Sequence, residues 1–417
     1  MTTFEISAPA SAALPAKASR PFADVWLITL GHTLTHWYPA TFYLLLPLIG
    51  NELGLSYGQI GSILTCQFVC GSLSNIPGGM IADAVPRKGI LMALALCWVG
   101  APYLLMGFTH SYWTLVGCAG LVGIGNNFWH PTAIPLLARS FPQRKGFVVS
   151  IHGMGGNVGD ALAPLAAGFL LAAMSWRNVV VINIVPGILM ACAILFFVGR
   201  LNVDSNSGAA RMQLPFAKGL RARLQDLREL LSNRTVVMIS LGSAFRAMTQ
   251  SALLTFLPLY LARQMGYSPK LVGTCMFMLQ AAGFAVTPIA GHLSDKMGRQ
   301  RIIVSSMAMT MVVLLGMAFA GHSAAFVLLV AFLGFFLFAV RSVLQAWLLD
   351  STPAHQGGTS IGILFGSQAL GAAIGPLSGG ILADHYGLNV VFLFLAGTIV
   401  IANLFVFFTP TPERSAV

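Results

Sequence analysis

Charged residues are scarce in this chain of 417 residues. Asp, Glu, Lys and Arg together make up 8% of the sequence, whereas hydrophobic residues make up 56%. A soluble domain carries about 25% charged residues. This shortage excludes a water-soluble protein and indicates one that lies in a lipid bilayer.

The sequence also lacks the motifs of several enzyme classes and of ATP-driven proteins. It has no Walker A sequence, no His-rich metal motif, no cluster of paired carboxylates and no nucleophile elbow. Its six cysteines all lie in apolar runs, where a thiol behaves as a small hydrophobic side chain. We therefore expect no enzyme activity, no cofactor, no metal site and no disulfide.

Long apolar runs, by contrast, are abundant. They are bounded by Gly, Pro and charged clusters and fall near residues 25–50, 57–82, 89–108, 111–138, 146–173, 178–199, 235–262, 269–294, 302–320, 323–349, 357–383 and 388–409. A helix needs roughly 20 apolar residues to cross a bilayer. We therefore predict an all-α integral membrane protein with twelve transmembrane helices.

The net charge of +11 is sorted by position along the chain. When the connections between spans are assigned alternately to the two sides, most Lys and Arg residues fall on the side of the N-terminal tail. The positive-inside rule then places both termini in the cytoplasm, and we expect a bacterial inner (plasma) membrane. This sorting accounts for the basic charge without a nucleic-acid partner.

The polar segments predict the domain boundaries. We expect a disordered cytoplasmic tail over 1–23, an N-terminal six-helix half over 24–199, a cytoplasmic linker over 200–234, a C-terminal half over 235–409 and a cytoplasmic tail over 410–417. In the linker, leucines recur at helical spacing at Leu220, Leu224, Leu227 and Leu231. This spacing favours an amphipathic helix on the inner leaflet, with a solvated linker as the alternative.

The two halves of the chain repeat each other. The segment LPLIGNELGLS (46–56) aligns with LPLYLARQMGYS (257–268), Gly61 aligns with Gly273, and Pro164 aligns with Pro376. Two pseudo-symmetric halves are typical of secondary transporters, which bind substrate between the halves near the membrane midplane.

One charged loop occurs in both halves, as GGMIADAVPRKG (78–89) and GHLSDKMGRQR (291–301). The loop resembles the signature of the major facilitator superfamily, and the resemblance extends over residues 24–409. We interpret its charged residues as a gating latch, namely Asp83, Arg87, Lys88, Asp295, Arg299 and Arg301. A loop that only sets topology is the alternative, but it does not predict an Asp at the same offset in both copies. Pro86 stands where the family usually has Gly, so we expect a different turn there.

Four local motifs resemble the fosmidomycin resistance protein group of this superfamily, a group associated with drug export. They are LGHTLTH (30–36), FWHP (128–131), SIHGMGGNVG (150–159) and ILADH (381–385). The family also carries a Gly-Pro motif in the fifth span that is typical of antiporters, and Asp160 interrupts its usual order here. The resemblance therefore favours antiport.

Polar residues at membrane depth are functional candidates because each costs free energy to insert. In spans one, four, seven and ten, the helices that line the central cavity in the superfamily, we predict that substrate contacts His32, His36, Tyr43, Asn126, Asn127, His130, Arg246, Gln250, Arg341 and Gln345. Guanidinium groups suit carboxylate or phosphonate, so we expect an anionic or amphipathic solute. For any one histidine, a structural hydrogen bond is the alternative.

Asp160 is the one acidic residue deep within a predicted span. We predict that it carries the coupling proton, with His32 or His36 as the next candidates, because imidazole titrates near neutral pH. A permanent ion pair between Asp160 and Arg341 or Arg246 is the alternative.

Together these features predict a secondary active transporter that works by alternating access. We expect a monomer in the lipid bilayer that exports a small organic solute or drug by antiport with protons. Proton-coupled uptake of an organic anion by symport is the nearest alternative. A membrane-embedded enzyme or a channel fits the sequence less well, since a channel needs no duplicated latch.

Overall fold

The computed structural model describes residues 22–197, 227–320, 323, 325–353 and 356–410, apart from the side chains of residues 76, 83 and 358. The predicted tails and most of the predicted linker helix lie outside these residues. The end of that linker is helical over residues 227–232. The described residues form helices and no strand.

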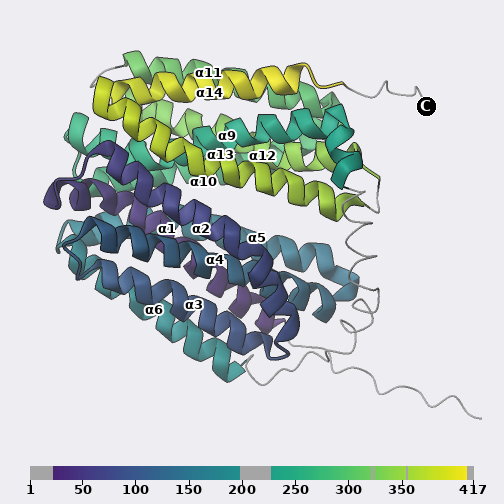
Figure 1. Ribbon diagram of the computed structural model, residues 1–417, viewed down its shortest axis with the longest axis horizontal. Coiled ribbons are helices and arrows are strands. Elements are labelled where there is room, and N and C mark those ends of the chain that lie inside the picture. Colours follow the sequence, from purple (N-terminus) through teal and green to yellow (C-terminus); the bar gives the residue numbers. More distant parts are fainter. Residues whose placement is uncertain (1–21, 198–226, 321–322, 324, 354–355, 411–417) are drawn as a thin grey trace, which may run out of the picture.

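Six long helices form the first half of the molecule. They are α1 (Ala23–Glu52), α2 (Tyr57–Ala84), α3 (Lys88–Met106), α4 (Tyr112–Ser140), α5 (Lys145–Leu171) and α6 (Trp176–Phe197), with a short 3₁₀ turn, η1 (Pro142–Arg144), before α5. They pack as one bundle, drawn in purple and blue in Figure 1.

Six more long helices form the second half. They are α9 (Arg234–Leu259), α10 (Pro269–Met297), α11 (Arg299–Phe319), α12 (Ala325–Asp350), α13 (Gly357–Tyr386) and α14 (Asn389–Phe407), and α9 continues into a π-helical turn, η3 (Tyr260–Gln264). They form the green and yellow bundle of Figure 1. The described residues thus confirm the predicted twelve helices in two six-helix halves.

The repeat in the sequence recurs in the way helices begin. At the start of α2, the Ser56 hydroxyl accepts a hydrogen bond from the backbone N–H of Gln59. At the start of α10, the Ser268 hydroxyl accepts one from the backbone N–H of Leu271. A serine in this position satisfies one of the free donors at a helix N-terminus. The same residue type therefore begins the second helix of each half.

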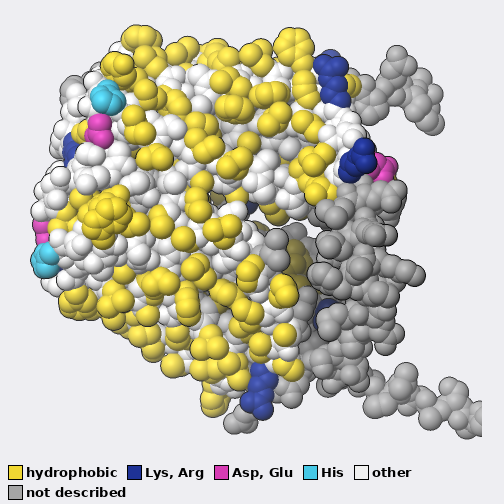
Figure 2. Space-filling view, in the orientation of Figure 1, with side chains coloured by type: hydrophobic (Ala, Val, Ile, Leu, Met, Phe, Trp, Pro, Cys, Tyr) yellow, Lys and Arg dark blue, Asp and Glu magenta, His cyan; other side chains and the backbone are white. Residues whose placement is uncertain are grey.

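The surface of the bundle is apolar, as a bilayer requires. Figure 2 shows hydrophobic side chains over most of this face, with charged side chains gathered at its two ends. Among the described residues, seven helices are long and apolar enough to cross a membrane by composition alone: α3, α6, α10, α11, α12, α13 and α14. The other five long helices, α1, α2, α4, α5 and α9, contain many of the polar and glycine residues that face the interior.

The two halves meet at one end of the bundle. We call this the distal end; it is where α1 ends and α2 begins. The opposite end, where α1 begins and α14 ends, is the terminal end. Between the halves, α2 packs on α13 and α5 packs on α10. Gly61 lies against the carbonyl oxygen of Pro376, and Gly273 lies against that of Pro164, so closely that a Cβ on either glycine would overlap with the carbonyl.

Toward the terminal end the halves separate. A Cβ placed on Gly79 of α2, Gly291 of α10 or Gly366 of α13 would have no neighbour within 4 Å in the described part of the chain. Figure 2 shows a hollow between the two halves. The halves are therefore closed together at the distal end and apart toward the terminal end.

Candidate functional site

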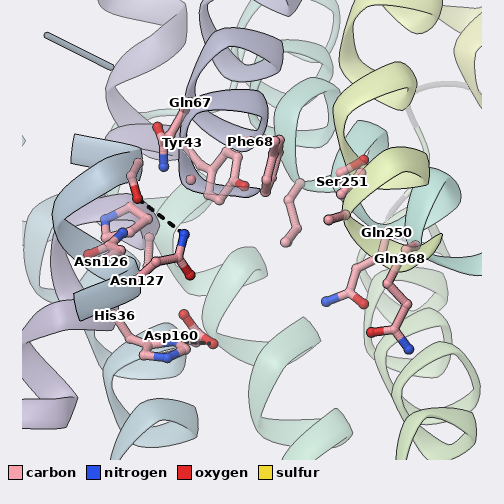
Figure 3. A pocket seen from close by; sticks show the side chains of 18 of the residues that line it. His36, Tyr43, Gln67, Phe68, Asn126, Asn127, Asp160, Gln250, Ser251 and Gln368 are labelled. Atoms are coloured by element: carbon pink, nitrogen blue, oxygen red, sulfur yellow. Dashed lines mark hydrogen bonds and ion pairs between the residues drawn. The ribbon is translucent and has the colours of Figure 1, made fainter. Parts of the chain in front are cut away.

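A cavity of about 430 Å³ lies between the two halves (Figure 3). Its wall includes polar residues from both halves, contributed by α1, α2, α4, α5, α9, α10, α12 and α13. Of the residues predicted to bind substrate, those that line it are His36, Tyr43, Asn126, Asn127, His130, Arg246, Gln250 and Arg341. Asp160 lines it as well.

Two predicted residues are set back from this wall. His32 has an exposed fraction of 3% and lies behind the cavity-lining residues. Gln345 is half-buried and is not part of the wall, although it lies one helical turn from Arg341 on α12. Helical spacing groups residues on one face, but it does not fix how far around the helix the cavity extends.

On the N-terminal half, Asp160 pairs with a histidine. His36 Nδ1 lies 3.1 Å from Asp160 Oδ2, and each side chain is about a third exposed to the cavity (Figure 3). While Asp160 is ionised its oxygen can only accept, so His36 then donates through Nδ1. The described residues contain no ion pair between Asp160 and either Arg246 or Arg341.

Behind this pair, three further histidines cluster in the same half. His32 Nε2 lies 3.0 Å from His130 Nε2, and His32 Nδ1 lies 2.7 Å from the main-chain oxygen of His152. The rings of His32 and His152 stack with their centroids 4.1 Å apart. The cluster joins α1, α4 and α5. Because these histidines are far apart in the sequence, no local sequence motif reveals the cluster.

Three of these histidines are close enough together to hold a metal ion. One ring nitrogen from each of His32, His36 and His130 lies within 4.8 Å of the others. However, His32 and His130 already lie at hydrogen-bond distance, which requires a proton on one of the two Nε2 atoms. A metal ligand must be deprotonated. The observed arrangement is therefore that of a hydrogen-bonded pair.

On the C-terminal half, two arginines have no carboxylate partner among the described residues. Arg246 has an exposed fraction of 2%; its Nη1 donates to Gln250 Oε1 at 2.9 Å, and its Nε has no hydrogen-bond partner among the described residues. Arg341 lines the cavity from α12. Among the described residues, neither guanidinium has an acidic oxygen within 4 Å. For the buried Arg246, uncompensated charge is costly unless an anion supplies the missing partner, whereas Arg341 is exposed.

Several polar lining residues were missed by the sequence reasoning. Gln67 and Asn75 come from α2, Gln280 from α10, and Ser251 and Gln368 from α9 and α13. Gln368 Nε2 donates to Ser243 Oγ at 2.5 Å. The signal that could have found most of them is the one already used, a polar side chain inside an apolar run. Apart from Asp160 in span five, candidates were taken only from spans one, four, seven and ten, and Ser251 in span seven was not among them.

The predicted gating residues lie at the terminal end. Arg299 forms ion pairs with Asp295 and, through Nε at 3.1 Å, with Asp350. Lys88 donates to the carbonyl oxygens of Ala82 and Val85. The side chain of Asp83 is outside the described part, and Arg87 and Arg301 are exposed.

The repeated loop differs between its two copies. Gly298 ends α10 with a φ of 99°, and Pro86 occupies the equivalent position after α2. Proline is fixed near −65°, so the two turns cannot have the same conformation. The contacts that Arg299 makes with Ser294, Asp295 and Asp350 lie within the C-terminal half, which agrees with the separation of the halves at this end.

At the distal end, a carboxylate bridges the two halves. Asp384 at the end of α13 accepts hydrogen bonds from the backbone N–H groups of Tyr57 (2.7 Å) and Gly58 (2.8 Å) at the start of α2. A negative charge is favourable at a helix N-terminus.

A second carboxylate, Glu52, follows the predicted span 25–50 at the same end. It accepts hydrogen bonds from the Trp176 indole at 2.6 Å and from Arg177. These contacts lower the pKa of Glu52 from its ordinary value, with the indole hydrogen bond as the largest cause. Glu52 therefore stays ionised and keeps α1 joined to α6 at this end.

Twelve helices in two similar halves around a central polar cavity define a multi-pass membrane transporter. The chain belongs to the Major Facilitator Superfamily, whose family model matches residues 25–359 and 239–417. The resemblance found in the sequence is thereby confirmed.

Several curated relatives align along nearly the whole chain. The fosmidomycin resistance protein of Escherichia coli (strain K12) is 27% identical over 391 residues, which cover 92% of this chain and 91% of the relative. The phosphoglycerate transporter protein of Salmonella typhimurium is 23% identical and covers 91% of this chain and 86% of its own length.

Solved structures share the fold. A bacterial homolog of the human lysosomal transporter Spinster, in an inward-facing and unoccupied conformation, superposes with a TM-score of 0.80 at 19% identity, covering 94% of this chain and 98% of that one. A point mutant of the nucleoside transporter NupG gives a TM-score of 0.78 at 11% identity, covering 93% of this chain and 100% of that one.

Proposed function

We propose that this transporter exports a small organic anion in exchange for protons, by alternating access across the bacterial inner membrane. The observation that carries the proposal is the cavity itself. Two arginines that have no carboxylate partner in the described part of the chain lie on one half, and the Asp160–His36 pair lies on the other. The first group binds an anion and the second takes up a proton.

Arg246 and Arg341 are the proposed anion contacts. A guanidinium stays charged and donates several hydrogen bonds in a fixed plane that fits a carboxylate or phosphonate. The unpartnered Nε of Arg246 leaves a buried donor available to such a group. Gln250 holds Arg246 through Nη1 and adds its own amide to the wall.

The remaining predicted contacts complete the proposed site. On the N-terminal half these are His36, Tyr43, Asn126, Asn127 and His130. We propose that His32 and Gln345 also belong to the site and act from behind the residues that line the cavity. The names of two relatives agree with an exported or anionic solute, since one is a fosmidomycin resistance protein and the other a phosphoglycerate transporter protein.

Asp160 is the proposed proton carrier, with His36 as the next candidate. Its hydrogen bond to His36 joins two titratable groups, so a proton that reaches either one changes the interaction between them. Because both side chains border the cavity, the pair can exchange its proton with water there.

The conformation fits one step of alternating access. If both termini lie in the cytoplasm, the terminal end is cytoplasmic and the halves are open toward that side. The charged loops with Asp83, Arg87, Lys88, Asp295, Arg299 and Arg301 would then close this side in the opposite state. We propose that one monomer, with its solute and protons, completes the whole cycle.

Uptake by symport is the second candidate, and one observation favours it. The arginines and the Asp160–His36 pair are separate groups, so an anion and a proton do not compete for the same atoms. Opposite charges in one cavity instead favour binding together. Antiport requires that binding of one ligand oppose binding of the other.

Reconstituted liposomes with an imposed pH gradient test the function. Purified full-length protein would be assayed with fosmidomycin, phosphoglycerate and an organic cation as probes. We expect anion flux against the direction of proton flow. Flux that follows the proton gradient would establish symport, and flux insensitive to the gradient, or selective for the cation, would overturn the proposal.

A further inference from the structure

We infer that His32 is a positioning residue that holds His130 in one tautomer, so that a ring lining the cavity offers an unprotonated nitrogen. This inference rests on the proposed function, because it concerns how the wall of the same cavity handles protons. It assigns His32 a role other than proton carrier or direct substrate contact.

The first step is the fixed tautomer of His32. Its Nδ1 lies 2.7 Å from the main-chain oxygen of His152, and a carbonyl oxygen can only accept. Nδ1 of His32 therefore carries a proton. His32 has an exposed fraction of 3%, so water does not compete for this hydrogen bond.

The second step follows from the neutral ring. When Nδ1 of a neutral imidazole is protonated, Nε2 has a lone pair and accepts. The Nε2 of His130 lies 3.0 Å from the Nε2 of His32, so His130 donates through Nε2. Nδ1 of His130 is then the acceptor. The main-chain carbonyl of His152 on α5 thus fixes the tautomer of the buried His32. His32 in turn fixes which ring nitrogen of His130 donates and which accepts.

A doubly protonated His32 would donate from Nε2, so His130 would have to carry its own proton on Nδ1 and accept through Nε2. That state is disfavoured because it places a charge on a ring with an exposed fraction of only 3%. Other charged or titratable groups around the cluster are His36 on α1, Asp160 and His152 on α5, Arg246 on α9 and Arg341 on α12. A proton that enters this region is therefore held by His36, Asp160 or Nδ1 of His130, and His32 stays neutral.

His152 supplies a matched control. Its side chain is 1% exposed, and neither ring nitrogen has a hydrogen-bond partner within the described part of the chain. It contributes through its main-chain oxygen and by stacking on His32 at 4.1 Å. His152→Phe keeps the carbonyl and a flat ring, so it is expected to leave the His32–His130 hydrogen bond intact.

Nitrogen-15 NMR of histidine-labelled, full-length protein in detergent tests the inference, with His130→Gln used to assign the signal. In the wild type and in His152→Phe, we expect His130 to be protonated at Nε2. In His32→Leu, which removes the acceptor, we expect a mixture of tautomers. His32→Gln supplies an amide oxygen in place of Nε2 and is expected to restore the wild-type tautomer.

A second readout is the pH dependence of transport in liposomes with phosphoglycerate and fosmidomycin as probes. His32→Leu is expected to shift the pH of half-maximal flux by about one unit, because a hydrogen bond to a titrating ring is worth roughly that much. His32→Gln should reverse the shift. A merely structural role would lower the amount of folded protein without moving this midpoint.

Three results would overturn the inference: protonation of His130 at Nδ1 in the wild type, an unchanged tautomer in His32→Leu, or stoichiometric Zn²⁺ binding that shifts both His32 and His130 signals. In the last case both Nε2 atoms would be lone-pair ligands. The tautomer is measured without a substrate. A wrong tautomer prediction therefore does not affect the test of proton-coupled flux. A lack of proton-coupled flux likewise does not affect the tautomer result.

Discussion

Gly61 on α2 lies directly against the main-chain carbonyl of Pro376 on α13, at the contact between the two halves. The internal repeat places Gly273 of α10 against the carbonyl of Pro164 on α5 in the same way. The two contacts are related by the pseudo-symmetry of the halves. Both lie near the distal end, where they allow the helices to approach closely.

This relationship predicts the effect of a single methyl group. Gly61→Ala would place a Cβ in overlap with the Pro376 carbonyl, and overpacking of this kind costs about 1–3 kcal/mol. We expect the distal end to open in a larger fraction of molecules. Spin labels on Gln59→Cys and His385→Cys, in a cysteine-free background, would show a longer distance by pulsed electron resonance.

Gly117→Ala is the matched control for that change. Gly117 is also helical, but a Cβ there would have no neighbour within 4 Å in the described part of the chain. We expect the label distance of the wild type. Equal distances in Gly61→Ala and Gly117→Ala would contradict the assignment of the close contact.

The carboxylate of Asp384 is predicted to stabilise the same closed end. Asp384→Asn keeps one oxygen acceptor for the start of α2 but removes the charge that favours a helix N-terminus, an effect of about 0.3–1 kcal/mol. We expect a smaller lengthening of the same label distance than in Gly61→Ala. High salt should reduce the difference between Asp384→Asn and the wild type, because screening weakens exposed electrostatic contacts.

Asp160→Asn tests the proton carrier. The amide cannot titrate, so transport driven by a pH gradient should fall to the level seen without a gradient. Exchange of labelled for unlabelled phosphoglycerate or fosmidomycin across the membrane needs no net proton movement and should continue. A variant that still responds fully to the gradient would exclude Asp160 as the carrier, and loss of both activities would indicate a structural role.

The two arginines are predicted to set the affinity for anions. Arg246→Gln and Arg341→Gln each remove one positive charge from the cavity, and a lost charge-assisted hydrogen bond costs about 1.5–3 kcal/mol. We expect binding of phosphoglycerate to weaken at least tenfold in each variant, measured by calorimetry. Arg139→Gln, an exposed change at the end of α4, is the control and should bind as the wild type does.

Much of this fold was predictable because a bilayer imposes local requirements. Each span needs an apolar run of sufficient length, and each turn needs polar or glycine residues, so the helices could be found without knowing their neighbours. Ser56 and Ser268 begin equivalent helices for the same local reason. The repeat then required two similar halves.

The candidate site was predictable only in part. Polar residues at membrane depth identified Asp160, Arg246 and Arg341, and all three line the cavity. The same reasoning placed Gln345 with them, but the wall does not reach it. It also omitted Gln280 and Gln368, because α10 and α13 were not expected to contribute.

The class of protein, the number of helices and the two halves could be read from the amino-acid sequence, since these depend on composition and on spacing along the chain. The packing of the helices is what pairs Asp160 with His36, 124 residues away, and leaves both arginines without an acidic partner among the described residues. It also decided that the halves are closed at the distal end. These features depend on how each helix is rotated and which helices meet, and this is set by packing among residues that are distant in the sequence.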